Sequence, residues 1–294
     1  KKDFIRLGVF GEWDNPYRTM DFQFEADIIR ALGGVVKNGH LSRGFKPVYW
    51  SVVGGSALAE AEVEYQDKTS FSIYVKYPAT EETALAIADA AGGHAGDGRL
   101  SVVIWTTTPW TLPSSQAVSV NADLEYVVVQ MGEERLLVAA ELKDAVLEAA
   151  GVSGDVVGRI QGAALEHLKV NHPFYDKQLP IILGDHVTTD AGTGCVHTAP
   201  DDFNVGKRYG IETLNYVDDN GLYRDSVPVF AGEHVYKVDG KIVELLKEKG
   251  VLLHEDKLVH SYPHCWRTKT PLIYRATPQW FISMQQNDLL DHAQ

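Results

Sequence analysis

Cysteine is scarce in this chain of 294 residues, which contains only Cys195 and Cys265. Two cysteines cannot build a disulfide framework, so we expect both to be ordinary reduced thiols. A structural zinc site normally takes four ligands, and the sequence does not offer four at suitable spacing. His264 and Cys265 supply only two of these ligands, so we predict that the chain binds no metal. We also predict that it binds no cofactor.

Long hydrophobic runs are missing as well. No run of about 18 apolar residues is present, and the N-terminus has no signal-peptide pattern. The hydrophobic content of 45% is that of a soluble globular protein. We therefore expect a cytoplasmic protein that does not enter a membrane.

Positive charge is in short supply, because 27 Lys and Arg face 40 Asp and Glu, for a formal net charge of −13. The acidic excess lies between residues 51 and 240, whereas the two ends are nearly balanced. Phosphate contacts require Lys and Arg, so this composition argues against a protein that holds nucleic acid by charge alone. If the chain acts on RNA, other domains must supply most of the affinity.

The apolar pattern predicts several helices and strands, in a chain without internal repeats. Residues 1–50 look largely helical, with Asp21 as the N-cap of their main helix. We expect helices over residues 20–36, 81–91, 139–150 and 236–249. We expect strands over residues 71–76, 100–104, 117–120 and 126–129, with further short strands through Val187.

Three glutamates alternate at Glu60, Glu62 and Glu64, so a strand would present all three on one face. Paired carboxylates can hydrolyse a sugar bond by acid–base chemistry. A row of charged residues is more commonly a solvated strand face, which we favour here. The carboxylate hydrolase is a rival function, and it requires these glutamates to lie side by side in a cleft.

A threonine-rich stretch follows the strand at 100–104 and reads Trp-Thr-Thr-Thr-Pro-Trp-Thr-Leu-Pro from Trp105 to Pro113. We name it the threonine turn. Proline lacks a ladder donor and favours extended geometry before it, so the strand should end near Thr108. Threonine hydroxyls donate once and accept twice on stiff stems, which suits a small pocket for a polar ligand. The alternative is a turn whose hydroxyls cap their own backbone.

A second stretch reads Gly-Thr-Gly-Cys-Val-His-Thr-Ala-Pro-Asp-Asp from Gly192 to Asp202. Gly192 and Gly194 permit close approach of the backbone to a ligand. His197 lies on an extended segment, and the aspartates begin a predicted helix over residues 203–209. An aspartate there is either a simple N-cap or a carboxylate aimed at a ligand's ammonium group. A lone histidine beside an aspartate is more commonly structural than catalytic.

Both stretches resemble the editing domain of the isoleucyl-tRNA synthetases, which are class I aminoacyl-tRNA synthetases. The threonine turn resembles that family's threonine-rich signature along its whole length. Valyl and leucyl relatives usually have Thr-Thr-Arg-Pro-(Glu/Asp)-Thr there, so Thr108 and Trp110 favour the isoleucyl branch. The second stretch resembles the family's second editing motif. The resemblance runs nearly from end to end, and includes the sequence around Tyr17 and Trp266.

The sequence departs from this family at three places. Many relatives have a zinc-binding Cys-x-x-Cys pair where this chain has Ser51 and Gly54. Relatives usually have about four more residues, of the Gly-His-Gly-x kind, between Pro200 and Asp201. Either this loop is deleted here, or a disordered stretch is missing from the sequence. We favour the second, because disorder concentrates in Gly-rich rim loops. The ATP-handling signatures His-Ile-Gly-His and Lys-Met-Ser-Lys-Ser are absent, so the resemblance implies that this chain cannot activate an amino acid.

The resemblance implies an α+β fold, namely a β-barrel-like editing domain of the valyl, isoleucyl and leucyl type with peripheral helices. It implies a helical connection over residues 1–50, the editing domain over 51–260 and a return segment over 261–294. The implied reaction is hydrolysis of the ester in mischarged valyl-tRNA(Ile). The implied partners are the valine-bearing 3′ end of tRNA(Ile) and the rest of the synthetase. The alternative is a non-catalytic module that only binds the aminoacylated 3′ end.

The resemblance also implies roles for single residues. Asp202 would bind the substrate's α-ammonium group, and His197 would form the wall that rejects isoleucine. The implied catalytic group is Thr106, Thr107, Thr108 and Asp202. Substrate contacts are implied for Trp105, Thr111, Leu112, Gly192, Thr193, Gly194, His197, Thr198 and Pro200. No protein general base is evident, so either a histidine of ordinary pKa or the substrate's vicinal ribose hydroxyl takes the proton.

Overall fold

The computed structural model describes residues 1–199, 208–211 and 215–293. They divide into two compact units, a larger one of Lys46–Thr277 and a smaller one of Lys1–Phe45 with Pro278–Gln294. The fold is α+β, as predicted. None of the described helices is long and apolar enough to cross a membrane. The predicted domain boundaries at residues 50 and 260 stay predictions.

The smaller unit is built around one amphipathic helix, and its elements are α1 (Lys2–Arg6), α2 (Phe22–Lys37), η5 (Gln286–Asp288) and α7 (Leu289–Ala293). α2 confirms the helix predicted over 20–36. Asp21 occupies the N-cap position but makes no capping hydrogen bond, and its carboxylate pairs with Arg18 at 2.8 Å. The prediction that residues 1–50 are largely helical is wrong from residue 41, where the strand β1 (Leu41–Ser51) begins. Pro47 and the aromatic residues beside it favour a strand over a helix interior.

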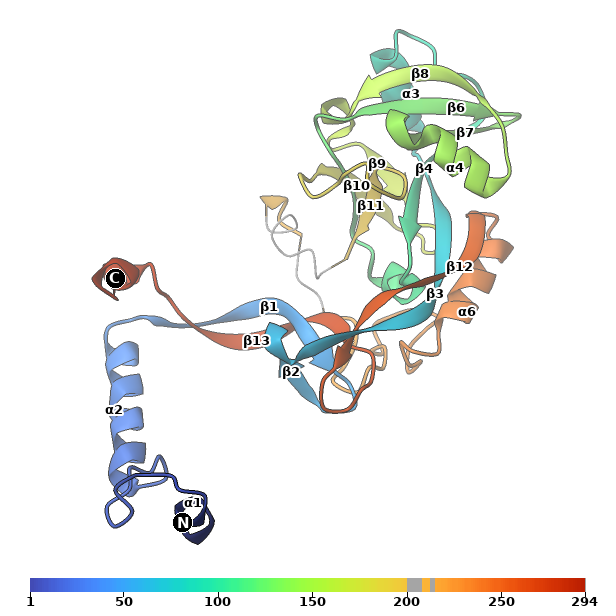
Figure 1. Ribbon diagram of the computed structural model, residues 1–294. Helices are drawn as coiled ribbons and strands as arrows, with labels where there is room; N and C mark the ends of the chain where they lie inside the picture. The colour runs from blue at the N-terminus through green and yellow to red at the C-terminus, as the bar shows by residue number, and fades with distance from the viewer. Residues whose placement is uncertain (200–207, 212–214, 294) are drawn as a thin grey trace. The chain divides into compact units, whose positions relative to one another are not determined.

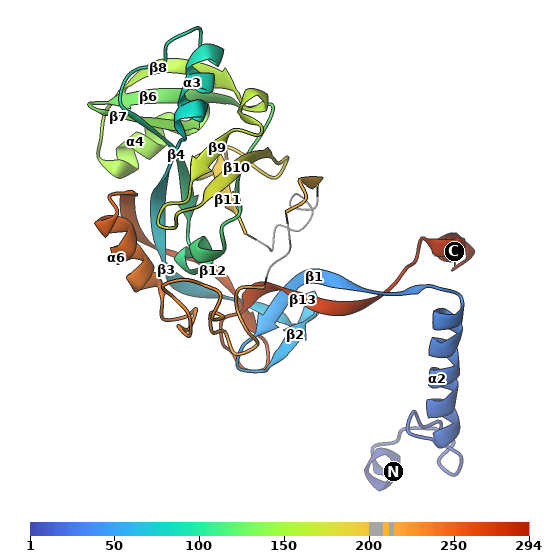
Figure 2. The ribbon, with the colours of Figure 1, turned by 180° about the vertical axis from the view of Figure 1, so that it is seen from behind.

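The main sheet of the larger unit has the strand order β12-β3-β4-β7-β6-β8. Its strands are β12 (Leu252–Cys265), β3 (Val63–Pro78), β4 (Arg99–Thr106), β7 (Glu134–Ala139), β6 (Glu125–Met131) and β8 (Asp155–Gln161). β3 and β12 pair antiparallel along almost their whole length, whereas β4 and β7 are parallel. In the opposite views of Figures 1 and 2, α4 (Lys143–Ala150) and α3 (Glu81–Ala90) lie on opposite faces of this sheet.

A second sheet has the order β11-β5-β10-β9. It consists of β11 (Cys195–Thr198), β5 (Ala117–Val120), β10 (Gln178–Leu183) and β9 (Lys169–Asn171). β11 runs antiparallel to β5, which places His197 opposite Val118. The third sheet is β13-β1-β2, with β13 (Ile273–Ile282) and β2 (Ser56–Leu58). Among the described strands, none of the three sheets closes into a ring.

Most of the other predicted elements are confirmed with shifted ends. β4 ends at Thr106 rather than near Thr108, and 3-10 turns occur at η2 (Pro109–Ser114), η3 (Ala140–Leu142) and η4 (Gly162–Leu165). The helix predicted over 139–150 is η3 followed by α4, and Gly151 ends it with a φ of 65°. The helix predicted over 236–249 is the shorter α6 (Asp239–Glu248). The helix predicted over 203–209 lies mostly outside the described residues.

The row of glutamates does not form a strand face. Glu60 and Glu62 lie in a 3-10 turn, η1 (Glu60–Glu62), and only Glu64 is on β3. The Glu62 carboxylate accepts a hydrogen bond from the Ala59 N–H at 3.0 Å, while Glu64 pairs with Lys269 at 2.6 Å. Alternation fails as a strand signal here because Glu62 satisfies the backbone of its own turn. The carboxylate hydrolase has no support, since two of the three carboxylates already have these structural partners.

The core of the larger unit is continuous and apolar. Ile73, Tyr77, Leu137, Ile181 and Leu246, from three strands of the two main sheets and from α6, are fully buried. Burying one such side chain stabilises a fold by about 1.5–3 kcal/mol. This packing holds the end of β4 and the adjoining turn against both sheets.

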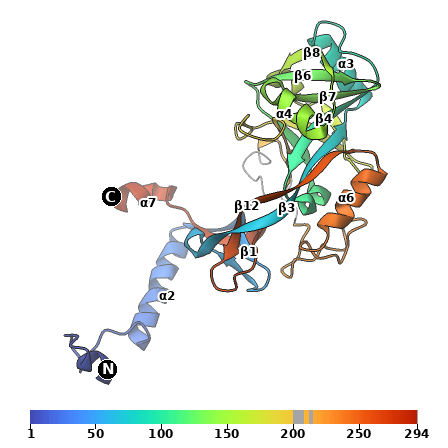
Figure 3. The ribbon, with the colours of Figure 1, turned by 45° about the vertical axis from the view of Figure 1, so that its right-hand side comes forward.

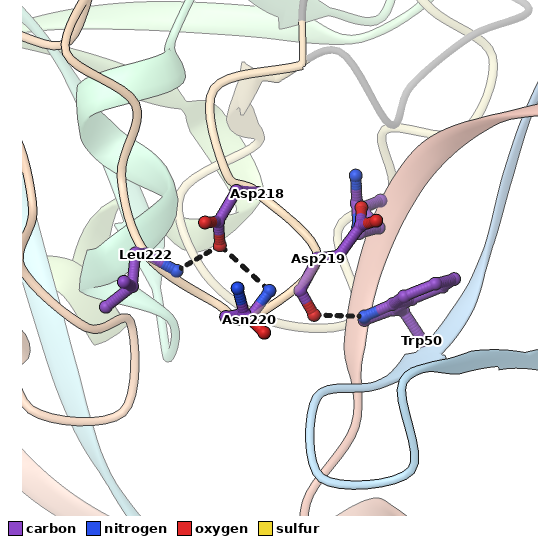
Figure 4. Close-up of polar contacts among 6 residues, drawn as sticks. Trp50, Asp218, Asp219, Asn220 and Leu222 are labelled. Carbon is purple, nitrogen blue, oxygen red and sulfur yellow. Dashed lines mark hydrogen bonds and ion pairs between the residues drawn. The ribbon is translucent and has the colours of Figure 1, made fainter.

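The loop before α6 is irregular but held by its own polar contacts (Figure 4). The Asp218 carboxylate accepts hydrogen bonds from the N–H groups of Asn220 and Leu222, each at 2.9 Å. The Trp50 indole donates to the Asp219 carbonyl at 2.9 Å. These bonds fix the chain just before Tyr223, a residue that contacts the threonine turn.

Candidate functional site

The threonine turn (residues 105–113) leaves the end of β4 and continues into η2, the green turn below β4 in Figure 1. Three bonds close it locally. The Thr108 N–H donates to Thr106 Oγ1 at 3.1 Å, and both the N–H and the hydroxyl of Thr111 donate to the Thr108 carbonyl, at 3.0 and 2.8 Å. The interpretation as a self-capping turn is therefore correct for Thr106 and Thr111.

The turn also contacts the second stretch. Thr111 Oγ1 and His197 Nε2 are 3.0 Å apart, and each residue is only 8% exposed. Further contacts link the hydroxyl of Thr108 to those of Thr106 at 3.2 Å and Thr111 at 3.5 Å. A line of threonine hydroxyls thus ends on the imidazole, which local capping does not explain.

The hydrogen bonds determine the protonation of His197. A carbonyl cannot donate, so the single hydroxyl proton of Thr111 goes to the Thr108 carbonyl. Thr111 Oγ1 must then accept from His197, which places the ring proton on Nε2. His197 Nδ1 is left as a buried acceptor without a partner among the described residues.

Burial lowers the pKa of His197 to about 4. The ring is therefore neutral at neutral pH, which agrees with the tautomer that its contacts require. General bases work best with a pKa near the working pH. The expectation of a histidine with an ordinary pKa is wrong for His197, and the ring is poorly suited to take a proton.

Three of the predicted contact residues belong to the frame of the site. Thr193 is 1% exposed, and its hydroxyl bonds with the carbonyl and N–H of Cys195 at 3.0 and 3.2 Å. Thr198 is equally buried and shares a hydrogen bond of 2.6 Å with Ser119. Leu112 is fully buried in the core. Their predicted contacts with a substrate stay predictions.

Two glycines let the second stretch pass close to its neighbours. Gly192 has a φ of 81°, and an added Cβ would lie 3.1 Å from the Trp105 indole. Gly194 has a φ of 72°, and its Cβ would lie 2.3 Å from the Cβ of Ala139. The Trp105 indole is held in turn by a hydrogen bond to Ser72 Oγ at 2.9 Å. Both glycines are thus required by packing, whatever their role toward a ligand.

Thr107 differs from the other threonines of the turn. It is half-buried, and its hydroxyl bonds to none of the described residues. Its hydroxyl is therefore partly accessible and has no partner among the residues that the structure describes. Pro200, Asp201 and Asp202 lie outside the described residues, and their predicted roles stay predictions.

Sequence reasoning missed three side chains that hold the turn. His172 Nε2 bonds to the Leu112 carbonyl at 3.0 Å, and His172 Nδ1 accepts from the Tyr175 N–H at 3.2 Å. Burial lowers the pKa of His172 to about 3, so it stays neutral too. Asp239 and Tyr223 bond to the Trp110 backbone. These residues lie far from the turn in sequence, and no local pattern signals their pairing.

A metal site is not evident in the described part of the chain, where no three His, Cys, Asp or Glu residues gather. Ser51, one of the two residues at which the resemblance leads us to expect a cysteine, accepts a hydrogen bond from the Gly54 N–H at 2.9 Å. The prediction that the chain binds no zinc stays a prediction.

Sequence comparison finds one family model over the whole chain. The model for the class I tRNA synthetases (I, L, M and V) matches residues 1–294. The chain is 68% identical over 296 residues to the isoleucine–tRNA ligase of Teredinibacter turnerae, and 67% identical over 295 residues to that of Saccharophagus degradans. Each match covers 99% of this chain but only 32% or 31% of the relative. The chain thus spans roughly a third of the length of these relatives.

Solved structures give weaker matches. The crystal structure of GlLeuRS-CP1 aligns with a TM-score of 0.49 and 17% identity, covering 62% of this chain and 97% of that chain. The editing domain of the P. knowlesi cytosolic leucyl-tRNA synthetase aligns with a TM-score of 0.46 and 11% identity, covering 66% and 97%. Because both TM-scores are below 0.5, the fold is described from this chain's own strands and helices and not from these matches.

Proposed function

This chain belongs to the class I tRNA synthetases (I, L, M and V), and from that membership we propose that it is the editing part of an isoleucyl-tRNA synthetase. The proposed reaction is hydrolysis of valyl-tRNA(Ile). Water attacks the ester carbonyl, the bond to the ribose oxygen breaks, and free valine and tRNA are released. The observation that carries the proposal is the buried contact between Thr111 and His197, which joins the two stretches in one site.

The need for such a reaction follows from the small difference between the two amino acids. One methylene in a hydrophobic pocket is worth only about 1–3 kcal/mol, and isoleucyl-tRNA synthetases are themselves the standard example. A second pocket that valine enters and isoleucine does not then removes the error. Stiff β-branched threonines and a buried imidazole suit the wall of such a pocket.

His197 is proposed as that wall. Its Nε2–H is committed to Thr111, and its ring is buried, so the imidazole is held in one orientation. A rigid wall discriminates by size better than an exposed side chain that can turn aside. Nδ1 has no partner among the described residues but is itself buried, so we assign it no contact with the substrate.

The proton of the attacking water is proposed to go to the substrate rather than to a protein base. The low pKa of His197 makes it a weak acceptor at neutral pH. The vicinal ribose hydroxyl lies next to the ester by covalent geometry and can relay the proton. Thr107, with its uncommitted hydroxyl, is the residue of the turn best able to orient the water or the ester carbonyl.

The proposed partners are the valine-bearing 3′ end of tRNA(Ile) and the remainder of the synthetase. The formal charge of −13 leaves the chain poorly suited to bind tRNA alone. In the smaller unit Phe10 is 98% exposed and Phe22 is 89% exposed. Large exposed apolar side chains are typical of surfaces that another part of a protein covers, which supports contact with the remaining synthetase.

A non-catalytic module that only binds the aminoacylated 3′ end is the competing function. It gains weight from the committed hydroxyls of the turn and the weak basicity of His197. Turnover separates the two, because a binding module protects the ester whereas an editing domain releases many valines per chain.

The test is deacylation of valyl-tRNA(Ile) by the wild type and by Asp202→Ala. If Asp202 binds the α-ammonium group by a charge-assisted bond, its loss misplaces the ester. A shift of about 1 Å can lower the rate roughly 100-fold. Asp144→Ala is the matched control, because Asp144 is an exposed aspartate in the first turn of α4. No release of valine by the wild type would leave only the binding module.

A further inference from the structure

The peptide groups on both sides of Trp110 are held by side chains from outside the threonine turn. Asp239 Oδ1 accepts a hydrogen bond from the Trp110 N–H at 2.9 Å, and the Tyr223 hydroxyl donates to the Trp110 carbonyl. Asp239 and Tyr223 lie 129 and 113 residues after Trp110 in the sequence. Asp239 is the first residue of α6, which lies beside the green turn in Figure 3. One donor and one acceptor thus fix Trp110 from two directions.

The Trp110 N–H needs such a partner. Trp110 lies in the first turn of η2, directly after Pro109, and the first N–H groups of a helix have no acceptor within it. A neutral side chain could satisfy this donor without the cost of burying a charge. The chain has a carboxylate instead, and a charge-assisted bond is shorter and stronger than a neutral one.

The surroundings of Asp239 raise and lower the pKa of its carboxyl group. Burial raises the pKa of its carboxyl to about 6, while the Trp110 N–H and the lysines Lys68 on β3 and Lys257 on β12 act in the opposite direction. Tyr223 and Tyr262 face it as well. Asp239 and both lysines line a cavity of about 280 Å³, which gives protons a route to the carboxylate.

The bond between Asp239 and the Trp110 N–H is linked to the candidate site through the backbone of the turn. Trp110 directly precedes Thr111, whose N–H and hydroxyl bond to Thr108 and whose Oγ1 accepts from His197. A rotation of the Trp110 peptide therefore moves Thr111 away from His197.

We propose that Asp239 is a positioning residue of the threonine turn, which holds Thr111 against His197 through its bond to the Trp110 N–H. The kinetic part of this proposal rests on the proposed editing function. The structural part does not, because the bond to Trp110 exists whatever reaction the site performs.

The experiment compares the wild type with Asp239→Ala and Asp239→Asn in the full-length synthetase. Asparagine keeps an oxygen acceptor and loses the titration, whereas alanine removes both. Two readouts are taken, namely amide hydrogen exchange of the peptide covering residues 106–115, and kcat and KM for valyl-tRNA(Ile) from pH 5 to 8. Asp144→Ala is again the control, with both readouts unchanged.

We expect Asp239→Ala to speed exchange of that peptide and to lower kcat about 10-fold or more, with little change in KM. Asp239→Asn should restore slow exchange and most of kcat. The wild-type kcat should fall as pH drops through 6, because a protonated carboxyl accepts more weakly, and the Asp239→Asn profile should lack that step.

Unchanged exchange in Asp239→Ala overturns the proposal, and so does equal loss of kcat in both variants. If the wild type does not hydrolyse valyl-tRNA(Ile), the proposed function fails instead. The exchange readout then still decides whether Asp239 holds the turn.

Discussion

At the scale of single residues, two buried histidines make the stability of the fold depend on pH. His172 and His197 are both neutral, because burial lowers their pKa values to about 3 and about 4. In the unfolded chain both rings titrate near the ordinary histidine pKa of about 6.5. The stability that each contributes is therefore complete above that pH and is lost as the pH falls toward the folded-state value.

The first prediction concerns this loss. Between pH 7 and pH 4.5 the free energy of unfolding should fall more in the wild type than in His197→Gln. The difference should be at most about 3 kcal/mol, since one pKa unit corresponds to about 1.4 kcal/mol. Urea denaturation at the two pH values measures it. His94→Gln is the control, because His94 is an exposed histidine of the same unit. An equal pH dependence in the wild type and in His197→Gln would contradict the buried neutral ring.

Some features of the candidate site could be predicted from single residues of the sequence, and others could not. The threonine turn and the second stretch could be assigned to one site because both resemble known motifs, and Thr111 does meet His197. The tautomer of His197 could not be predicted, because it depends on which oxygen takes the Thr111 proton. Nor could Asp239 be identified, since its partner lies 129 residues away and no local pattern signals such a pair.

At the scale of elements, periodicity succeeds where one face of an element decides its structure. α2 and β4 were predicted because helical spacing indicates an amphipathic helix and because β-branched residues in a short apolar run favour a strand. The glutamates at 60–64 misled, because alternating charge also fits a 3-10 turn whose Glu62 side chain caps the Ala59 N–H. The end of β4 was misplaced by two residues, because Thr106 Oγ1 accepts from the Thr108 N–H and turns the chain early.

The second prediction concerns the approach of β11 to β7. Gly194→Ala should lower the free energy of unfolding by about 2–4 kcal/mol, as left-handed strain adds to overpacking against Ala139. Gly151→Ala is the matched control, with a similar φ of 65° and nothing within 4 Å of its Cβ. It should lose only about 1–2 kcal/mol of strain. Thermal or urea unfolding of both variants measures the difference, and equal losses would mean that packing at Gly194 is loose.

At the scale of the whole molecule, the chain matches one part of longer relatives. It spans roughly a third of the length of relatives that are 67–68% identical to it. The contact between Thr111 and His197 lies in the larger unit, Lys46–Thr277, which contains the two main sheets and their core. Composition alone pointed away from RNA, because net charge describes the average surface and not one small pocket.

The third prediction is that the purified protein contains no zinc. Ser51 and Gly54 stand where the resemblance leads us to expect a cysteine pair, and the chain has only two cysteines. Elemental analysis after dialysis without chelator should find far less than one equivalent. Added EDTA should leave the melting temperature unchanged, whereas a structural zinc would be lost with a clear drop. One equivalent of zinc in the native protein would contradict the prediction.

The proposed function depends most on the proposal that His197 forms the wall of a pocket that separates amino acids by size. The decisive measurement is deacylation of valyl-tRNA(Ile) and isoleucyl-tRNA(Ile) by the wild type and His197→Ala, with tRNA in excess to offset the weak binding of an acidic chain. We predict that the wild type hydrolyses only the valyl ester. His197→Ala should hydrolyse both, because the shortened wall admits the longer side chain. Loss of activity on both substrates in His197→Ala would show that His197 is catalytic or structural, and would contradict discrimination by size.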